Sequence, residues 1–396
     1  MHPHLKRLSQ CADAPHRLII GLMSGTSLDG LDVALCRLTG CGNQTQCELL
    51  AFETLAYSQD EKATILSVFS KAEVSLQQLT LVNAWLGRLH GEMVNSCLAK
   101  WQVDAQTVDC IASHGQTIFH CPKHQHGLAQ FGHATLQIGD ADHLAVTTGI
   151  TTLSDFRQKH IAVGGEGAPL AIYGDHLLFS DATEHRVLLN LGGIANLTLL
   201  PANGALESVL CSDLGPANTM IDAYVRTHLA LPYDKDGALA RAGSVHQELL
   251  AALCNHDFCH RALPKSTGPE VFNLALLAQA QAQTNTTLLS HQDVVSTLTE
   301  FSAWLVAEAI SELALQRPNL SVYASGGGAS NPELVARIIA RLDKRIHFTT
   351  TSQLGVNPDA KEAILFALLA NESLCVPRQG EASVLNVAMG KISFPS

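Results

Sequence analysis

The sequence predicts an α/β protein with two similar lobes, each a mixed sheet with flanking helices, around a central cleft. Strand-like apolar runs alternate with helix-periodic stretches along the chain, which is typical of layered α/β folds. A strand, a glycine turn and a second strand open each half, at residues 17–38 and again at 185–200. This repeat in architecture predicts the two lobes.

The elements of the first half follow from local patterns. Apolar and β-branched runs on either side of Gly25 and Gly30 predict a hairpin at 17–38. Helix-periodic apolar residues predict one long helix at 62–101. Further strands are expected at 48–57, 108–113, 135–139 and 150–154.

The second half repeats the theme with a hairpin at 185–200 that turns at Gly192 and Gly193. The elements expected after it are a strand, loop and helix at 208–226, a helix at 288–315, a strand at 321–324, a helix at 331–342, a strand at 346–350 and a helix at 359–370. The resulting division is a polar leader at 1–17, an N-terminal lobe at 18–150 and a C-terminal lobe at 151–396. The last helix is a candidate to pack back on the first lobe.

Composition excludes several classes of protein. Of the 396 residues, 46% are hydrophobic, which excludes general disorder, and the formal charge of −11 argues against nucleic-acid binding. The 11 cysteines are scattered without a CxxC pair, which indicates reduced thiols and a cytoplasmic protein. No signal peptide and no run long enough for a membrane span is present.

The first chemical motif is the turn of the first hairpin, whose residues are small, hydroxylated or acidic: Gly25, Thr26, Ser27, Leu28, Asp29, Gly30, Leu31 and Asp32. Glycines let a phosphate approach the backbone, and amides and hydroxyls donate hydrogen bonds to it. Two carboxylates, Asp29 and Asp32, are candidate ligands of Mg²⁺. A plain hairpin turn has a similar composition and remains the alternative.

The second motif, Asp213-Leu214-Gly215-Pro216-Ala217-Asn218, lies between an expected strand and an expected helix. Ligands bind α/β sheets at such strand ends, so Asp213 is a candidate general base. Gly215 would admit a phosphate and Asn218 would add a donor. The alternative is that Asp213 only caps the helix. A third, weaker motif is the run Gly326, Gly327 and Gly328, which clears space for a flat group such as adenine.

The three motifs occur in the order found in the actin-like ATPase and sugar kinase superfamily, whose lobes are RNase H-like. Eight blocks narrow the resemblance: IGLMSGTSLDGLDVAL at 20–35, IASHGQTI at 111–118, LQIGDADHLA at 136–145, DFRQKHIAVGGEGAPL at 155–170, LLNLGGIANLT at 188–198, DLGPANTMIDA at 213–223, LPKSTGPEVFN at 263–273 and SGGGASNPEL at 325–334. Together they resemble the anhydro-N-acetylmuramic acid kinase family over about residues 18–395. The sequence departs from the superfamily pattern at Met23, where Asp is common, and at Lys159, where some relatives carry Arg.

The resemblance implies a cytoplasmic, dimeric, magnesium-dependent kinase of peptidoglycan recycling and amino sugar metabolism. Such an enzyme opens its anhydro sugar with water while phosphorylating it from ATP, giving N-acetylmuramic acid 6-phosphate. By this resemblance, residues 25–32 form the ATP phosphate loop and Asp213 is the catalytic base. The nucleotide side would further include Gly192, Gly193, Asn196, Gly215, Asn218 and Gly326–Gly328. The residues expected to face the sugar are His114, Gln116, Thr117, Arg157, Lys159 and Glu362.

Two other functions remain open from the sequence: an ordinary sugar or polyol kinase of the same superfamily, and a nucleotide-gated sugar sensor. The leader is too short for the DNA-binding module that a sensor would need. Five potential zinc ligands gather at His120, Cys121, His124, His126 and His133, but their spacing matches no familiar zinc pattern. Glu362 lies in an apolar helix, which favours a ligand contact, and an exposed position on the helix face remains the alternative.

Overall fold

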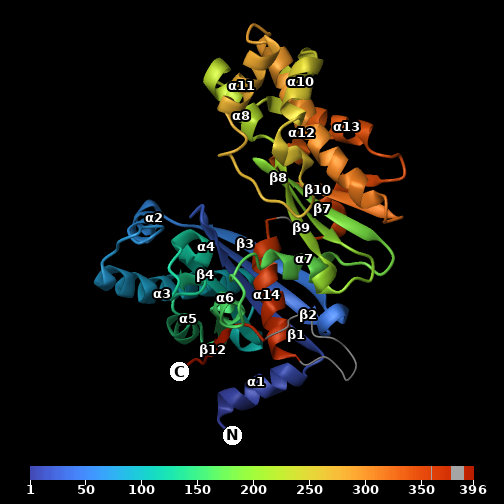
Figure 1. Ribbon diagram of the computed structural model, residues 1–396. Helices are drawn as coiled ribbons and strands as arrows, with labels where there is room; N and C mark the ends of the chain where they lie inside the picture. Colours follow the sequence, from blue (N-terminus) through green and yellow to red (C-terminus); the bar gives the residue numbers. More distant parts are fainter. Residues whose placement is uncertain (358, 376–387) are drawn as a thin grey trace. The chain divides into compact units, whose positions relative to one another are not determined.

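Two β-sheets organise the chain, as a computed structural model of residues 1–357, 359–375 and 388–396 shows (Figure 1). The chain divides into two units. Unit 1 contains residues 1–178 and 359–396, and unit 2 contains residues 179–358. The mixed α/β class with two sheets is therefore confirmed. Among the described residues, no helix has the length and apolar character that crossing a membrane requires.

The sheet of unit 1 has seven strands in the order β12-β6-β4-β1-β2-β3, with β5 paired to β4. Its strands are β1 (His16–Ser24), β2 (Gly30–Thr39), β3 (Gln46–Ala56), β4 (Cys110–Cys121), β5 (Ala134–Ile138), β6 (Thr152–Ser154) and β12 (Lys391–Ser393). Its helices are α1 (Pro3–Asp13), α2 (Gln59–Leu66), α3 (Leu76–Trp101), α4 (Lys123–His126), α5 (Ala141–Thr148), α6 (Phe156–Ala162) and α14 (Lys361–Leu374), and α7 (Ala171–Phe179) leads into unit 2. The sheet is mixed because β4 runs parallel to β1 and β6, while β2, β3, β5 and β12 pair antiparallel.

Helices α3 and α14 cover opposite faces of this sheet. Successive side chains of a strand alternate between faces, and Ile20 and Leu22 of β1 join the core that α3 supplies through Val82 and Leu86. Between them, Gly21 faces α14, where a Cβ would lie 1.9 Å from the carbonyl oxygen of Ala363. A glycine is required here, and it lets α14 lie directly on β1.

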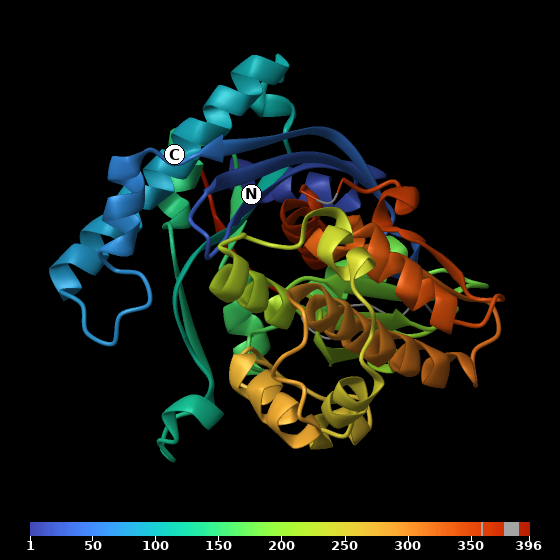
Figure 2. The same cartoon turned by 90° about the horizontal axis from the view of Figure 1, so that it is seen from above.

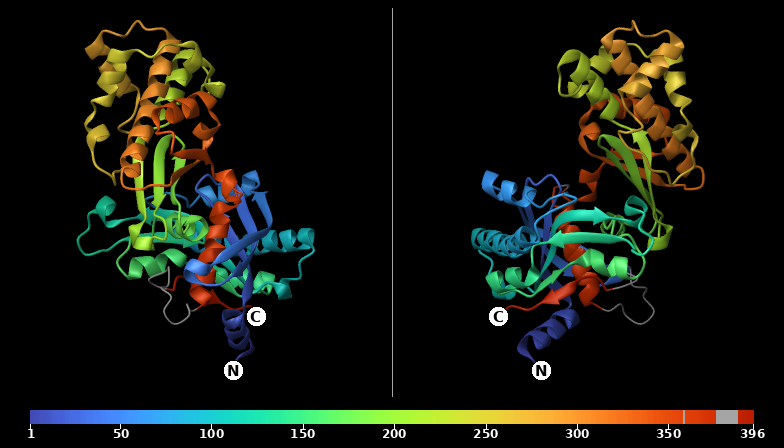
Figure 3. Two further views of the ribbon diagram at one scale, coloured as in Figure 1. Left: turned by 90° about the vertical axis from the view of Figure 1, so that its right-hand side faces the viewer. Right: turned by 60° about the vertical axis from the view of Figure 1, so that its left-hand side comes forward.

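The sheet of unit 2 has five strands in the order β11-β10-β7-β8-β9. They are β7 (His185–Leu191), β8 (Ile194–Leu200), β9 (Leu210–Pro216), β10 (Leu320–Ser325) and β11 (His347–Thr350). The helices are α8 (Thr219–Leu229), α9 (Ala238–Ala242), α10 (Gln247–Cys254), α11 (Leu274–Thr284), α12 (His291–Ala314) and α13 (Pro332–Arg341). Helix α12 serves two cores: one face packs on the sheet, and the other packs against α8, α10 and α11 (Figure 3).

The long helix expected at 62–101 is two helices. Ser58 and Ser75 each cap a new N-terminus, at α2 and α3, by accepting a backbone hydrogen bond from Glu61 and Gln78. Between the helices, Ser70 adopts a left-handed conformation and its N–H bonds to the carbonyl of Ile118 in β4. Apolar periodicity continues across both helices, so it did not reveal the break.

Two expected strands are longer than predicted, and both extensions contain site residues. Strand β4 continues to Cys121 because β5 pairs with its second half, from Gln116 opposite Ile138 to Cys121 opposite Ala134. The two strands form a ribbon with α4 near its tip (Figure 2). Strand β9 continues to Pro216 because β8 pairs with it along its length. The C-terminal ends of β4 and β9 are therefore determined by pairing with other strands, which local sequence does not show.

The division into units differs from the predicted one at 150. Strand β6 pairs with β4 in the first sheet, so the first unit continues to residue 178, and unit 2 ends before residue 359. Helix α14 belongs to unit 1, where it packs on β1, β2 and β4. The polar leader is also part of this unit: residues 3–13 form α1, Cys11 is buried, and Arg7 donates to the carbonyls of Gln106 and Val108.

Candidate active site

The glycine turn between β1 and β2 is the first candidate region, and it lies in unit 1. Leu28 is buried with a positive φ of 57°, so it anchors the turn, while Thr26, Ser27 and Asp29 are exposed. The N–H of Leu28 donates to the carbonyl of Gly25, and the N–H of Tyr57 donates to that of Asp29. The turn thus presents two hydroxyls and a carboxylate from a fixed backbone.

A buried chain of hydrogen bonds lies beneath this turn. The Ser24 hydroxyl donates to Oε1 of Gln116 over 2.5 Å and is 2.8 Å from the hydroxyl of Tyr57. The Tyr57 hydroxyl is in turn 2.7 Å from Nε2 of His90 on α3. Burial lowers the pKa of His90 to about 3 and raises that of Tyr57, so both groups are neutral at ordinary pH. Sequence reasoning missed Ser24, Tyr57 and His90.

The side chain of Gln116 connects this network to the glycine turn. Its Nε2 donates to the carbonyl of Gly25 over 3.2 Å, and its side chain is fully buried. It was expected to face the sugar; the structure places it where it supports the glycine turn. Thr117, its neighbour, is half-buried and its hydroxyl accepts a hydrogen bond from Gln137 over 3.1 Å.

The two candidate metal ligands differ in environment. Asp29 is exposed, whereas Asp32 is half-buried and its Oδ1 accepts a hydrogen bond of 2.6 Å from the hydroxyl of Thr54. Burial raises the pKa of Asp32, and the negative charges of Asp359 and Asp29 raise it further. Carboxylate oxygens are the ligands that Mg²⁺ prefers, and a cation here would relieve their mutual repulsion. The residues present therefore fit a magnesium ion.

The sugar-side candidates His114 and Arg157 meet in unit 1. Nε of Arg157 donates to Nε2 of His114 over 3.1 Å, and its Nη1 donates to the carbonyl of Gly167 over 2.7 Å. The His114 ring packs against Phe366 of α14, with centroids 4.8 Å apart. Burial, aided by the charge of Arg157, lowers the pKa of His114 to about 3. The neutral ring thus accepts a hydrogen bond from a fixed cation.

One atom of His114 has no partner among the described residues: Nδ1, which is buried. The residue lines a cavity of about 280 Å³ together with Gly115, Gln137, Asp140 and Asp155. The Oε1 of Gln137 is also buried without a partner among the described residues. Unpartnered buried polar atoms are costly, so this cavity is suited to a polar ligand.

Glu362 lies in the first turn of α14 and is exposed to solvent. Desolvation by the surrounding protein raises the pKa of its carboxyl, and the charge of Asp32 adds to this, while Lys361 and Arg157 oppose it. The pKa of Glu362 thus responds to the charges of one metal candidate, Asp32, and of one sugar candidate, Arg157. Lys159 is exposed on α6.

Asp213 lies in unit 2, inside strand β9 rather than in a loop. Its Oδ2 accepts hydrogen bonds of 3.0 Å from the hydroxyl of Ser266 and from the N–H of Thr267. The cap of α8 is Asn218, so the alternative that Asp213 caps this helix is wrong. Ser266 and Thr267 belong to the block at 263–273. In the sequence, the feature that could have revealed them is a pair of hydroxyl residues next to Gly268, which resembles the composition of the turn at 25–30.

The segment that carries Ser266 is itself fixed to β9. The N–H of Asp213 donates to the carbonyl of Lys265 over 2.9 Å, and the Lys265 N–H donates to the hydroxyl of Ser212 over 2.9 Å. Asn196, expected in a turn, is in β8 and lies opposite Asp213 in the strand register. The backbone of Asp213 is thus paired on both sides, with β8 and with the segment at Lys265.

The glycines of unit 2 converge on one place. The carbonyl of Gly193 accepts hydrogen bonds from the N–H groups of Ala217 and Thr219, and Nδ2 of Asn218 donates to the carbonyl of Gly192 over 2.8 Å. These contacts join the β7–β8 turn to the start of α8. Gly215, which lies two residues before Ala217 in the chain, is buried.

The run Gly326–Gly328 packs onto the same turn. Gly326 has a φ of 81°, and a Cβ there would lie 2.5 Å from Oδ1 of Asn190, so only glycine fits. Gly327 faces open space and lines a cavity of about 390 Å³ with Asn218, Asp222 and Tyr233. Of the residues of unit 2 expected to bind the nucleotide, Asn218 and Gly327 therefore line a cavity large enough for a flat ring system.

The histidine loop at 120–133 uses its nitrogens in local hydrogen bonds. Nδ1 of His126 accepts from the N–H of Leu128, and Nδ1 of His133 accepts from the N–H of Lys123. Within the described part of the chain, the group of His, Cys, Asp or Glu ligands close enough to share a metal lies elsewhere, at Cys41, Glu372 and Cys375.

Comparisons with known proteins show the family of this chain. The family model for anhydro-N-acetylmuramic acid kinase matches residues 17–379. Proteins named anhydro-N-acetylmuramic acid kinase from Pseudoalteromonas atlantica and Pseudoalteromonas translucida are 56% and 54% identical, each over 100% of both chains. One from Caldanaerobacter subterraneus is 35% identical over 98% of this chain and 100% of its own. The chain therefore belongs to the anhydro-N-acetylmuramic acid kinase family, and its enzymatic activity is that of a kinase.

Proposed function

We propose that this kinase opens 1,6-anhydro-N-acetylmuramic acid with water and phosphorylates the released 6-hydroxyl from ATP. The products are N-acetylmuramic acid 6-phosphate and ADP. Water supplies the oxygen at C1, the bond from C1 to O6 breaks, and O6 takes the γ-phosphoryl group. The observation that carries this proposal is the carboxylate of Asp213, which lies in a strand and is oriented by two donors.

Asp213 is the general base of the proposed reaction. Among the described residues, the hydrogen bonds to its side chain go to Oδ2, which leaves Oδ1 to accept a proton from water. The segment at Lys265 fixes the backbone of Asp213, so the carboxylate is oriented before substrate binds. Orientation of this kind is what general-base catalysis requires, and it typically contributes about 10²–10⁴-fold in rate.

The glycine turn at 25–32 is proposed to hold the phosphates of ATP, and the cavity beside Gly327 is proposed to hold its adenosine. Exposed hydroxyls at Thr26 and Ser27 donate to phosphate oxygens from a backbone that Leu28 anchors. Mg²⁺, held by Asp29 and Asp32, would neutralise charge on the transferred phosphoryl group. Gln116 and Tyr57 keep the turn in place.

His114, Arg157 and Glu362 are proposed to bind the sugar, which carries a lactyl carboxylate and an acetamido group. Arg157 is the fixed cation that would receive a carboxylate. His114, whose buried Nδ1 has no hydrogen-bond partner among the described residues, lines a polar cavity. Glu362 would accept from a sugar hydroxyl. Thr117 and Lys159 are proposed as further contacts.

The cellular setting follows from the same reaction, which belongs to peptidoglycan recycling. The cytoplasm is the proposed location, and its support is that all 11 cysteines are free thiols. The homodimer implied by the family resemblance is retained as part of this proposal.

The test is to incubate the protein with Mg-ATP and the anhydro sugar and to identify the product by mass spectrometry. The proposal predicts N-acetylmuramic acid 6-phosphate, formed in equal amount with ADP. An ordinary sugar kinase would instead phosphorylate a free hydroxyl and leave the anhydro ring intact, which would contradict the proposal. A sensor would bind both ligands and release no ADP.

A further inference from the structure

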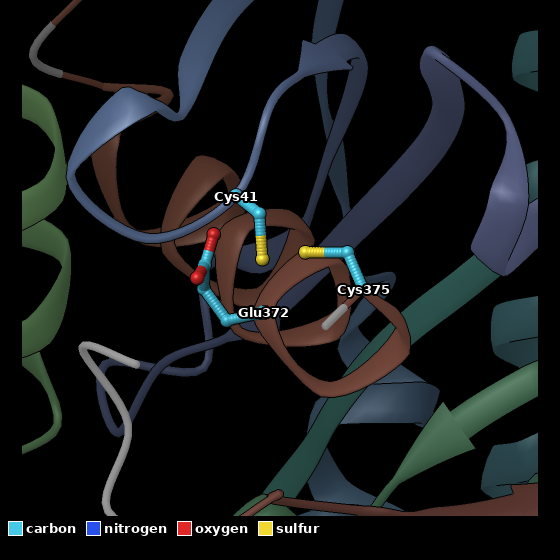
Figure 4. A group of neighbouring side chains, drawn as sticks. All are labelled: Cys41, Glu372 and Cys375. Carbon is cyan, nitrogen blue, oxygen red and sulfur yellow. The ribbon is translucent and has the colours of Figure 1, made fainter. Parts of the chain in front are cut away.

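Two cysteines from distant parts of the sequence face each other in unit 1. Cys41 immediately precedes the short 3₁₀ turn η1 (Gly42–Gln44) between β2 and β3, and Cys375 follows the last turn of α14. Their sulfurs and a carboxylate oxygen of Glu372 lie within 4.8 Å of one another. Figure 4 shows the two sulfurs directed toward each other, with the Glu372 carboxylate beside Cys41.

The surroundings of this pair disfavour a metal ion. The Glu372 carboxylate already accepts from the N–H of Gly42 over 2.8 Å and from the hydroxyl of Thr45 over 2.5 Å. Nδ2 of Asn371 donates to the same carboxylate over 3.0 Å, and Arg17 bonds to Oδ1 of Asn371 over 2.7 Å. A cation would compete with these donors and with the charge of Arg17. A bond between the two sulfurs adds no charge and uses none of these donors.

We propose that Cys41 and Cys375 are a thiol pair that a small-molecule disulfide, such as oxidised glutathione, converts into a disulfide bond. Cys41 is partly exposed, so the reagent reaches it, while Cys375 is buried behind it. The Cys41 sulfur attacks one sulfur of the reagent and releases one small thiol. Cys375 then attacks the Cys41 sulfur and releases the second, so two protein thiols are oxidised and one reagent disulfide is reduced.

The ionisation of the two thiols supports this order of attack. Burial raises the pKa of both groups, and the charge of Glu372 raises both further. For Cys41, a hydrogen bond from Cys375 and the charge of Arg17 act in the opposite direction. For Cys375, the contact with Cys41 raises the pKa further. Cys41 is therefore the better nucleophile of the two, because the thiolate is the attacking species.

The bond would change how unit 1 is held together. Unit 1 consists of two chain segments, 1–178 and 359–396, and within the chain these segments are joined only through unit 2. Cys41 lies in the first segment and Cys375 in the second. A disulfide would tie α14 covalently to the β2–β3 connection, and Glu362 lies at the other end of the same helix. Cross-linking segments that far apart in sequence restricts the unfolded chain and stabilises the native fold.

The test treats the reduced full-length protein with oxidised glutathione, blocks remaining thiols with iodoacetamide, and maps linked peptides by mass spectrometry without reduction. The proposal predicts a Cys41–Cys375 linked peptide, two fewer alkylated thiols per chain, and a higher Tm that dithiothreitol reverses. Cys41→Ser and Cys375→Ser should each abolish the link. Cys47→Ser is the matched control, because Cys47 is also partly exposed and adjoins another thiol, Cys36, that is fully buried. In this variant the Cys41–Cys375 link should form as in the wild-type protein.

Three outcomes would overturn the proposal. All 11 cysteines could remain alkylatable, the link could join other cysteines, or glutathione could stay attached to Cys41 without transfer to Cys375. Purified protein that contains one zinc per chain, and loses it in Cys41→Ser, would show a metal site in place of the thiol pair. Circular dichroism of each variant checks that the fold is retained.

Discussion

The backbone N–H of Thr267 lies 3.0 Å from Oδ2 of Asp213 and donates a hydrogen bond to it. The two residues belong to different parts of unit 2, and the hydroxyl of Ser266 makes a second bond of the same length to the same oxygen. A carboxylate that only capped a helix would instead accept from the first turn of α8. The arrangement fixes the orientation of the proposed base, which was expected in a loop.

Asp213→Asn should retain the fold and both substrate affinities while turnover falls at least about 10²-fold. The amide oxygen of Asn accepts the same two hydrogen bonds but takes no proton from water. Steady-state ADP release measures the loss, and calorimetry measures ATP and sugar binding. Near-normal turnover would remove Asp213 from the role of base.

Ser266→Ala should reduce kcat by less, about tenfold, because one charged-group hydrogen bond is lost and the Thr267 N–H remains. The KM for ATP should change little. Glu270→Ala is the control, since this exposed residue belongs to the same segment and its side chain forms no hydrogen bond with Asp213. Equal losses in the two variants would mean that the segment matters for folding rather than for orienting Asp213.

Tyr57→Phe removes the hydroxyl that joins Ser24 to His90 beneath the glycine turn. A buried histidine nitrogen then loses its partner, which costs roughly 1–3 kcal/mol in free energy of unfolding. Because the turn is proposed to bind phosphate, the KM for ATP should rise while the KM for the sugar changes less. Urea unfolding and initial-rate kinetics measure both. A variant with wild-type stability and an unchanged KM for ATP would show that the network contributes neither to stability nor to the conformation of the glycine turn.

Stability should fall as the pH is lowered below about 6.5, because the buried histidines His90 and His114 have pKa values near 3. Unfolding returns each to its ordinary pKa, so between pH 6.5 and 3 the unfolded chain binds more protons than the native one. Each histidine therefore removes about 3 kcal/mol of stability by pH 4.5. His90→Gln should weaken this dependence on pH.

Urea unfolding at several pH values measures this effect, and His347→Gln, at an exposed position, is the control. The free energy of unfolding of His90→Gln should fall less steeply between pH 6.5 and 4.5 than that of the control. Parallel curves for both variants would contradict the assignment of a neutral, buried His90.

Gly21→Ala should destabilise unit 1 more than an ordinary surface change does. The added Cβ would meet the backbone oxygen of Ala363 at 1.9 Å, so α14 must move away from β1. Overpacking of this kind typically costs about 1–3 kcal/mol, and the displaced helix carries Glu362. Gly132→Ala is the control because a Cβ there meets nothing within 4 Å. Thermal unfolding compares the two, and equal Tm values would contradict the packing of α14 on β1.

Much of the fold could be predicted because its signals are local. The hairpins at 17–38 and 185–200 carry their own turn residues, and the helix ending at Trp101 carries its own apolar periodicity. The ends of β4 and β9 could not be predicted, since they depend on strands that pair with them from elsewhere. The boundary expected at residue 150 differs from the observed one because β6 pairs with β4 from farther along the chain, whereas the return of the last helix to the first lobe was anticipated.

The site shows the same limit. Asp213, Arg157 and the glycine turns carry chemistry in their own side chains or backbone, so their motifs were visible. Tyr57 and His90 were not, because each acts through a partner on another element, and an isolated histidine on α3 resembles any other polar residue in a helix. Ser266 and Thr267 became meaningful only when the structure placed them against β9.

The central claim is that water attacks C1 of the anhydro sugar while O6 is phosphorylated. The most direct measurement is the reaction in ¹⁸O-labelled water with Mg-ATP, followed at once by mass spectrometry of the sugar product and of its phosphate. The account predicts one ¹⁸O at C1 of N-acetylmuramic acid 6-phosphate and none in the phosphoryl group, above the exchange seen when finished product is incubated alone in labelled water. Label in the phosphate, or a phosphorylated sugar with its anhydro ring intact, would contradict it.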